Sequence, residues 1–188
     1  MKNVFYLLIA ALIMGGCTYN NEALTLDVYK GEYSGKNVQN NKTVYLRSVK
    51  DMRTDKKNIG YTLINEQKDQ TLYSDIDFVN KYTTGLRYAL DIAGFEIVSN
   101  KTDANKILDI SIQEIEIVYN NKIFGTNLRG LLAIEVLVEK DQKVTTLNFK
   151  PQASQWISPS YTSKDLEPFL HTLFSDSINN ITSRLTEY

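Results

Sequence analysis

Cysteine and histidine each occur only once in this 188-residue sequence, as Cys17 and His171. One cysteine can form neither an intrachain disulfide nor a multi-cysteine zinc site. One histidine leaves no HEXXH zinc motif, and any histidine-dependent catalytic triad would have to use His171. The sequence also lacks GXSXG, Walker and dinucleotide-binding glycine motifs. We therefore predict a protein that is not an enzyme, with no catalytic residue, no metal site and no cofactor.

An excess of charge of either sign is also missing, because 21 basic residues stand against 22 acidic ones and the formal net charge is −1. Binding to a phosphate backbone requires a clustered positive surface, and the sequence contains no basic run. We therefore expect no nucleic-acid partner. Proline is rare, at three residues, whereas tyrosine is frequent, at twelve. This balance favours β-strands over a disordered chain.

The amino terminus has the pattern of an export signal. Lys2 is followed by an uncharged apolar run over residues 4–14, which is shorter than the ~20 residues that a membrane-spanning helix needs. Such a run is typical of a secretory signal peptide. Met14-Gly15-Gly16-Cys17 then resembles the lipobox of bacterial lipoproteins, with Met14 in place of the commoner leucine. The alternative is an ordinary signal peptide that is cleaved near Gly16 and leaves a free thiol.

The lipobox and the apolar pattern after it predict that the chain has three segments. Residues 1–16 are predicted as a lipoprotein signal peptide, residues 17–42 as the lipidated Cys17 and a flexible tether, and residues 43–188 as a single α+β periplasmic domain. Two or three acyl chains on Cys17 would hold the domain at a membrane, because a single chain binds only marginally. Thr18 follows the cysteine, where aspartate would favour the inner membrane. We therefore expect the periplasmic face of the outer membrane.

The spacing of apolar residues predicts the elements of the domain. Strands are expected near residues 43–49, 59–64, 95–98, 107–119, 128–138 and 144–149, and helices over residues 74–94 and 163–184. Ser74 is the predicted N-cap of the first helix, and Gly94 its stop. Apolar residues change parity within 107–119, which predicts a β-bulge near Gln113-Glu114. The predicted fold class is α+β, with an antiparallel sheet and two amphipathic helices packed on one face.

The order of these elements resembles the YajG-type family of uncharacterised bacterial lipoproteins. The resemblance covers roughly residues 43–186 and rests on the lipobox at Cys17, Asp51-X-Arg53-Thr54-Asp55 at the end of the first strand, Ala93-Gly94-Phe95 after the first helix, the alternating strand and long hairpin, and Asp176-Ser177-Ile178 in the last helix. It implies an outer-membrane-associated lipoprotein without an assigned activity. The asparagine-rich linker and residues 65–73 depart from the family pattern.

Two places carry candidate interaction residues. Asp51, Arg53 and Asp55 bring both charges to a strand end, where an arginine could bind a carboxylate or phosphate in a bidentate manner. The alternative is a turn held by a local ion pair and Asx-type hydrogen bonds. Trp156, the single tryptophan, could contact a partner, or it could be half-buried core.

Asp109, Glu114 and Glu116 could serve in acid–base chemistry if they met His171 in one cleft. The alternation of residues 114–117 instead favours a solvated strand face, which Asp109 need not share across the bulge. We therefore predict a membrane-anchored envelope lipoprotein that acts as a non-catalytic binding or scaffold module in the periplasm, with an envelope protein as its partner. The alternatives are a carrier of a lipid or small hydrophobic ligand between the helices and the sheet, and a cell-wall-acting enzyme.

Overall fold

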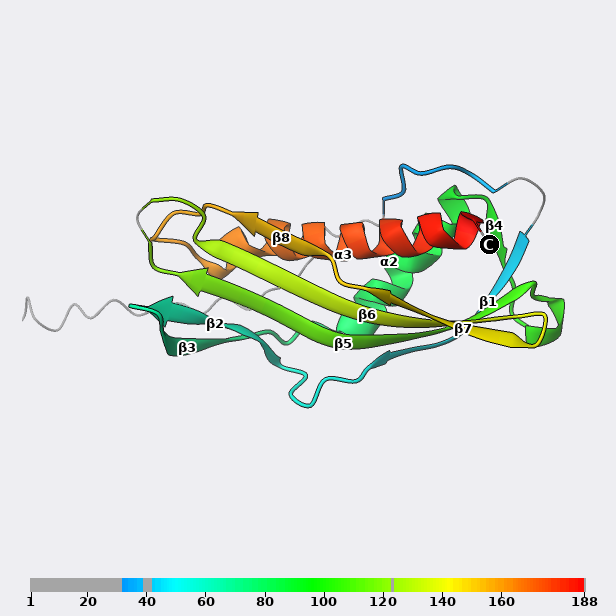
Figure 1. Ribbon diagram of the computed structural model, residues 1–188, viewed down its shortest axis with the longest axis horizontal. Coiled ribbons are helices and arrows are strands. Elements are labelled where there is room, and N and C mark those ends of the chain that lie inside the picture. The colour runs from blue at the N-terminus through cyan, green and yellow to red at the C-terminus, as the bar shows by residue number, and fades with distance from the viewer. Residues whose placement is uncertain (1–31, 39–41, 123, 188) are drawn as a thin grey trace, which may run out of the picture.

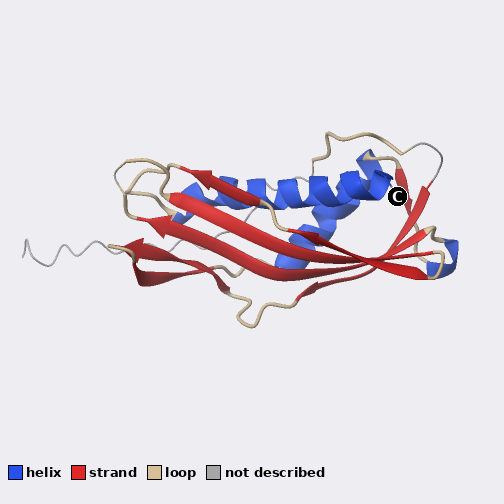
Figure 2. Ribbon diagram, viewed as in Figure 1, coloured by secondary structure: helices blue, strands red, loops and turns tan. Residues whose placement is uncertain are grey.

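The computed structural model describes residues 32–38, 42–122 and 124–187. Figures 1 and 2 show two layers in this part of the chain, an eight-stranded mixed sheet and two helices. The helices are α2 (Phe78–Ile92) and α3 (Ser163–Glu187), and a short 3-10 helix is η1 (Lys101–Asp103). The strands are β1 (Lys42–Asp51), β2 (Asn58–Ile64), β3 (Gln67–Tyr73), β4 (Phe95–Ile97), β5 (Lys106–Asn120), β6 (Leu128–Lys140), β7 (Lys143–Phe149) and β8 (Gln152–Gln155). The predicted α+β class with two helices is confirmed.

Strands β5 and β6 form the centre of the sheet and pair antiparallel along most of their length. β1 and β2 share the other edge of β5, where β1 pairs with residues 106–112 and β2 with residues 117–120, both in parallel. β7 and β8 likewise share the second edge of β6 and pair antiparallel with it. β4 and β3 lie outside β1 and β2. We call β1 with β2, and β7 with β8, the two flanking rows of the sheet. Each row is interrupted near its middle, where one strand ends and the next begins.

The predicted antiparallel sheet is wrong in three pairings, because β1–β5, β2–β5 and β1–β4 are parallel. The reason is the connection through α2, which returns the chain to the end of the sheet at which β1 begins. β4 and β5 then start beside Lys42 and Val44, on either side of β1. Crossovers of this kind join parallel strands. Apolar periodicity marks which side chains are buried, and it carries no information on strand direction.

The predicted β-bulge is confirmed, since the register of β5 against β6 shifts between Ile112 and Glu114. Ile112 pairs with Ile134 before the shift, and Ile115 pairs with Leu132 after it. These four isoleucine and leucine side chains are buried, so both apolar runs of β5 reach the helix side of the sheet. The opposite side, which we call the outer face, is made by Asp109, Ser111, Glu114 and Glu116 of β5 and by their partners Leu137, Glu135, Ala133 and Leu131 of β6.

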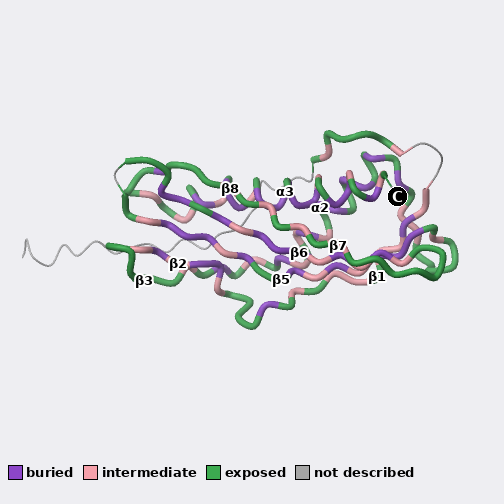
Figure 3. Tube along the Cα trace, viewed as in Figure 1, coloured by how far each residue is buried: buried purple, intermediate pink, exposed green. Residues whose placement is uncertain are grey.

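Helices α2 and α3 close the core on the helix side of the sheet. Gly130 of β6 lets α3 approach, because a Cβ atom there would lie 2.5 Å from the Phe169 ring and 2.6 Å from Leu173. Tyr82 of α2 and Ser177 of α3 are both buried, and their hydroxyls share a hydrogen bond of 2.6 Å. Figure 3 shows the buried residues along the central strands and the two helices. The carrier hypothesis places its ligand in this same space, which a continuous apolar cluster occupies.

Helix α2 begins later than predicted. Asp77 caps it instead of Ser74, and the Asp77 carboxylate accepts a hydrogen bond of 2.9 Å from the backbone N–H of Asn80. Ser74 accepts a backbone hydrogen bond in the turn that precedes the helix. Gly94, with φ at +86°, ends the helix as predicted. Both Ser74 and Asp77 are favoured N-cap residues, so composition alone could not decide between them.

The segment 32–38 lies against the folded domain. The backbone N–H of Val38 donates to the carbonyl of Ala93 at 2.8 Å, and Tyr33 and Val38 pack against the core. These residues fall within the range 17–42 that the sequence assigns to the tether. Within the described segments, neither helix combines the length and the hydropathy needed to cross a bilayer. The predicted signal peptide, Cys17 and Thr18 lie outside the described residues.

Candidate functional site

Arg53 organises the loop that joins β1 to β2. Its Nε donates to the Asp51 carboxylate at 3.0 Å, and its Nη2 donates to the same carboxylate at 2.7 Å. Nη1 donates to the carbonyl of Asn58 at 2.8 Å, and Nη2 also donates to the carbonyl of Lys56 at 2.6 Å. The guanidinium therefore connects the end of β1 at Asp51, the loop residue Lys56 and the start of β2 at Asn58.

The Arg53–Asp51 pair is also withdrawn from solvent. The two side chains are 6% and 8% exposed, and the Arg53 guanidinium lies 5.0 Å from the centre of the Phe78 ring in the first turn of α2. A buried guanidinium that is hydrogen-bonded to internal acceptors is poorly placed to bind an external carboxylate or phosphate. This geometry favours the second interpretation of the motif, a turn held by a local ion pair.

Asp55 has a local role in the same loop. Its carboxylate accepts hydrogen bonds from the backbone N–H groups of Lys57 at 3.0 Å and Asn58 at 3.2 Å, which is an Asx-type turn. Lys57 itself forms an exposed ion pair of 2.8 Å with Asp75, and this hydrogen bond raises the pKa of Lys57. The structure thus brings Asp51, Arg53 and Asp55 together, as the sequence predicted, in contacts that close a loop.

A second ionic network on the outer face was not predicted from the sequence. Arg47 of β1 forms an ion pair with Asp109 of β5 and a second one, at 2.9 Å, with Glu139 of β6. Asp109 also accepts a hydrogen bond of 2.7 Å from Ser48, and Glu139 forms an ion pair of 3.1 Å with Lys101 of η1. The network therefore connects three strands and η1. Its members meet only through strand pairing, which the sequence does not reveal.

The network changes the acidity of its carboxyl groups. The hydrogen bond from Arg47 is the largest cause that lowers the pKa of Asp109, and burial opposes it. The hydrogen bond from Lys101 is the largest cause that lowers the pKa of Glu139. Both carboxyl groups are therefore ionised at neutral pH and serve as ion-pair partners. Neither has the raised pKa that a general acid needs at neutral pH.

The residues that could have formed an acid–base site are separated by the sheet. Asp109, Glu114 and Glu116 all lie on the outer face, because the bulge puts Asp109 on the same side as the two glutamates. His171 belongs to α3, which packs on the helix side against Gly130. In the described ranges, no three histidine, cysteine or acidic side chains are grouped so that they could hold a metal ion.

Lys106 is a buried cation that sequence reasoning missed. Its side chain is on the helix side of β5, at the end of the sheet where β4 lies, and its Nζ is 5.3 Å from the centre of the Phe95 ring. Burial, together with the charges of Lys42 and Lys140, lowers the pKa of Lys106 to about 8. A basic residue at the start of an apolar strand gives no sequence signal that separates this position from a surface lysine.

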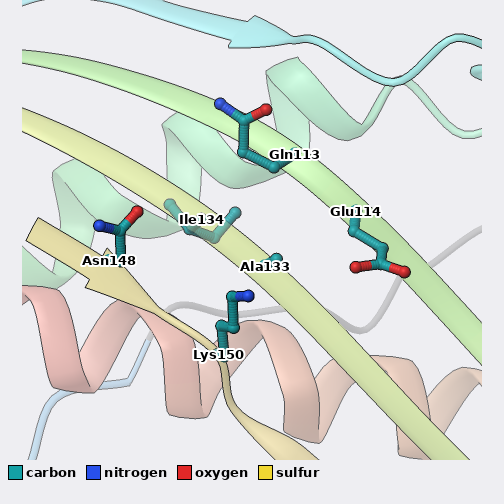
Figure 4. Close-up of a pocket in the computed structure, with 6 residues that line it drawn as sticks. All are labelled: Gln113, Glu114, Ala133, Ile134, Asn148 and Lys150. Carbon is teal, nitrogen blue, oxygen red and sulfur yellow. The ribbon is translucent and has the colours of Figure 1, made fainter.

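A shallow depression opens on the outer face at the centre of the sheet. It has a volume of about 400 Å³ and is lined by Gln113, Glu114, Ala133, Ile134, Asn148 and Lys150. Figure 4 shows Ala133 between Glu114 and Lys150. The depression forms because the small Ala133 side chain lies where β5 carries its bulge and where the row of β7 and β8 is interrupted. Its polar, open rim suits a polar or charged group of a partner better than a lipid.

Trp156 lies far from the loop of Arg53, at the end of the sheet where β5 ends and β6 begins. It is 54% exposed and directly follows β8. Its neighbour Ile157 is fixed by Asn127, whose side chain accepts a hydrogen bond from the Ile157 N–H and donates one to the Ile157 carbonyl, both at 2.8 Å. The Trp156 side chain is therefore accessible to a partner.

Comparison with known sequences and structures gives a family and a fold. A sequence profile described as "Uncharacterized lipoprotein" matches residues 32–184. A search of curated proteins gave no match. A crystal structure of an uncharacterized protein aligns with a TM-score of 0.51 and 13% identity, covering 87% of this chain and 99% of that chain. Protein XCC0632 from Xanthomonas campestris aligns at 0.49 and 11% identity, covering 84% and 91%. At 13% identity, the likeness to the first of these structures shows the fold alone.

Replacing Asp51 by alanine tests the closed loop. Asp51→Ala leaves the Arg53 guanidinium buried without its carboxylate, so we expect a loss of about 3–5 kcal/mol in the free energy of unfolding. The matched control is Asp75→Ala, which removes the exposed pair with Lys57 and should change stability very little. Urea unfolding measures both. Equal losses in the two variants would show that the loop is not held by the buried pair.

The pH dependence of stability tests the Arg47 network. Because the folded-state pKa of Asp109 is lowered, its contribution is present at neutral pH and is lost as pH falls below the ordinary value of about 3.9. Arg47→Met should therefore destabilise the protein at pH 7, and the difference from the parent should shrink towards pH 2.5. Arg87→Met, an exposed arginine on α2, is the control and should give a small, pH-independent difference. A constant Arg47→Met effect across this range would contradict the network.

Proposed function

Because this chain belongs to the family of uncharacterized lipoproteins whose profile matches residues 32–184, we propose that it is a lipid-anchored envelope protein that acts as a non-catalytic binding module. The observation that carries the proposal is the lone cysteine of the sequence, which lies at the end of a predicted export signal and fifteen residues before the start of the matched domain at residue 32. In this reading the thiol of Cys17 accepts the lipid, and the family domain is what the lipid holds at the membrane.

The physical consequence of the anchor is confinement. Each buried methylene group of an acyl chain contributes ~0.8 kcal/mol, so two or three chains on Cys17 make release into water negligible. The domain then meets its partners within a thin layer beside the bilayer, where weak contacts are strengthened by a high effective concentration. The outer membrane is favoured over the inner membrane because Thr18, and not aspartate, follows the cysteine.

A non-catalytic role is supported by the way the charged groups are used. Arg53 and Asp51 close a loop, Asp109 and Glu139 are ion-pair partners, and His171 is on the other side of the sheet from the acidic residues. Catalysis by acid and base requires such groups to converge on one point. The cell-wall-acting enzyme that the sequence left as an alternative has no such point of convergence among the described residues.

The outer face is the surface that we propose for partner binding. In the segments that the structure describes, both helices pack on the helix side and no element covers the outer face (Figure 1). The depression at Ala133 lies at its centre, and Glu114 and Lys150 offer charges of both signs at its rim. An envelope protein that presents a polar or charged side chain to this depression fits the geometry better than a hydrophobic ligand does.

Replacing the cysteine tests the anchor. Cys17→Ser should shift the protein from the membrane fraction to the soluble fraction, because serine cannot form the thioether that carries the lipid. Mass spectrometry of the amino-terminal peptide should show the acyl mass in the parent alone. Thr18→Asp is the matched variant that should keep the lipid and change the membrane, which density-gradient separation detects. A parent protein without fatty acid, or one found in the soluble fraction, would refute the anchor.

Site-specific crosslinking tests the binding surface. A photoreactive amino acid in place of Asn148, which lines the depression, should give a discrete adduct in intact cells. The same substitution at Asn180, an exposed asparagine of α3 on the helix side of the molecule, is the control and should give none. A Glu114→Lys/Lys150→Glu charge reversal should abolish the adduct from Asn148. Adducts that form equally from both positions, or that ignore the charge reversal, would exclude the outer face as the specific surface.

A further inference from the structure

We propose that one end of this domain inserts exposed apolar side chains into the surface of the same membrane that holds the lipid. We call this end the apolar tip and define it by Ile64, Phe124 and Trp156. The inference rests on the proposed lipid anchor, and it adds a second, non-covalent contact with the bilayer. It concerns a different part of the molecule from the depression on the outer face.

The three side chains are all exposed to solvent. Ile64 is 45% exposed, Phe124 is 88% exposed and Trp156 is 54% exposed. A single exposed apolar side chain is ordinary in a water-soluble surface, whereas several on adjoining loops mark a contact with a protein or a membrane. The apolar tip therefore has to be explained as a group.

Hydrogen bonds show that the three segments that carry these side chains adjoin. The N–H of Asn121, in the loop that carries Phe124, donates to the carbonyl of Leu63 beside Ile64 at 3.1 Å. The N–H of Asn127, at the other end of that loop, donates to the carbonyl of Gln155 beside Trp156 at 3.3 Å. Figure 1 shows the β2–β3 turn, the β5–β6 loop and the segment after β8 together at one end of the sheet.

The tip is held in place from within. Asn127 is almost fully buried, and its side chain forms two hydrogen bonds of 2.8 Å with the backbone of Ile157. Its carbonyl accepts a further hydrogen bond of 2.7 Å from Asn120 at the end of β5. The backbone on both sides of Trp156 is thus fixed by the end of the sheet. The indole is presented outward on an ordered support, so contact with a bilayer costs little ordering of the backbone.

The chemistry of the tip fits the interfacial layer of a bilayer. Tryptophan is enriched there because its ring is apolar and its N–H is polar, and phenylalanine and isoleucine can enter the acyl boundary. Lys122, exposed and two residues from Phe124, can reach lipid phosphates, while Glu66 in the β2–β3 turn balances its charge. The residues lie on three separate segments, which are the end of β2, the β5–β6 loop and the segment after β8, and a fluid surface needs no matching shape to receive them. These features favour a membrane over a protein partner at this end.

The anchor can bring the tip to the membrane. Residues 17–31 can span at most ~50 Å when fully extended, at ~3.3–3.6 Å per residue. The fifteen residues of β5, which run the length of the sheet, cover a similar ~50 Å. The described segment 32–38 lies within that length, running from beside β4 towards α3 (Figure 1). The tip is therefore within reach of a bilayer that holds the lipid on Cys17.

The single tryptophan makes the proposal measurable in the full lipidated protein. The protein is reconstituted in vesicles of phosphatidylethanolamine and phosphatidylglycerol, with or without phosphatidylcholine brominated near the head group. We expect the emission of Trp156 to shift to shorter wavelength on reconstitution and to lose intensity in the brominated vesicles. Phe124→Ser should reduce this quenching, because the neighbouring side chain no longer draws the tip into the bilayer, and the protein should stay on the vesicles.

A reporter at a different exposed position is the control. Tyr88 of α2 is also 54% exposed, so the Trp156→Phe/Tyr88→Trp variant carries its tryptophan away from the tip at equal accessibility. This reporter should not be quenched. Quenching that is equal at the two positions, or absent at both, would overturn the apolar tip. Vesicle flotation separates this failure from a failure of the anchor, since a protein without lipid would not float at all.

Discussion

The antiparallel pairing of β5 with β6 supports the rest of the sheet. β1 and β2 bond to the outer edge of β5, and β7 and β8 bond to the outer edge of β6, so each flanking row depends on one central strand. The β-bulge between Ile112 and Glu114 is the adjustment that lets this pair bury apolar side chains along its whole length. Gly130 then permits α3 to lie directly on the pair, and the two helices complete the core.

The charged residues of the protein mainly stabilise connections. Arg53 and Asp51 close the interruption between β1 and β2, and the same pair belongs to the motif on which the resemblance to the YajG-type family rests. Arg47 joins β1 to β5 and β6 on the outer face. A motif that carries a family resemblance can therefore reflect the geometry of a loop and need not mark a binding site. The polar groups that line the depression around Ala133 are the ones that we propose for contact with a partner.

Sequence reasoning succeeded where the signal is local and failed where it depends on pairing. The change of parity within β5 located the bulge, and apolar spacing located α3 from its first residue at Ser163. Strand direction was missed because a parallel and an antiparallel strand bury the same side chains. The depression was missed because Glu114 and Lys150 are far apart in the sequence and meet only through β6. For Trp156, the spacing could not decide between a half-buried core position and an accessible one.

The interruptions in the flanking rows have a consequence for a crowded membrane. Open sheet edges tend to pair with each other, and a lipid anchor would concentrate identical chains in two dimensions, where such pairing is favoured. Here the outermost strands are short: β4 has three residues, β8 has four, and β3 and β7 have seven each. β4 pairs only with the first three residues of β1, so the rest of β1 is open as well, and the open edge on each side of the sheet is divided into short segments. Among the residues that the structure describes, neighbouring copies find no outermost strand longer than seven residues on which a stack could grow.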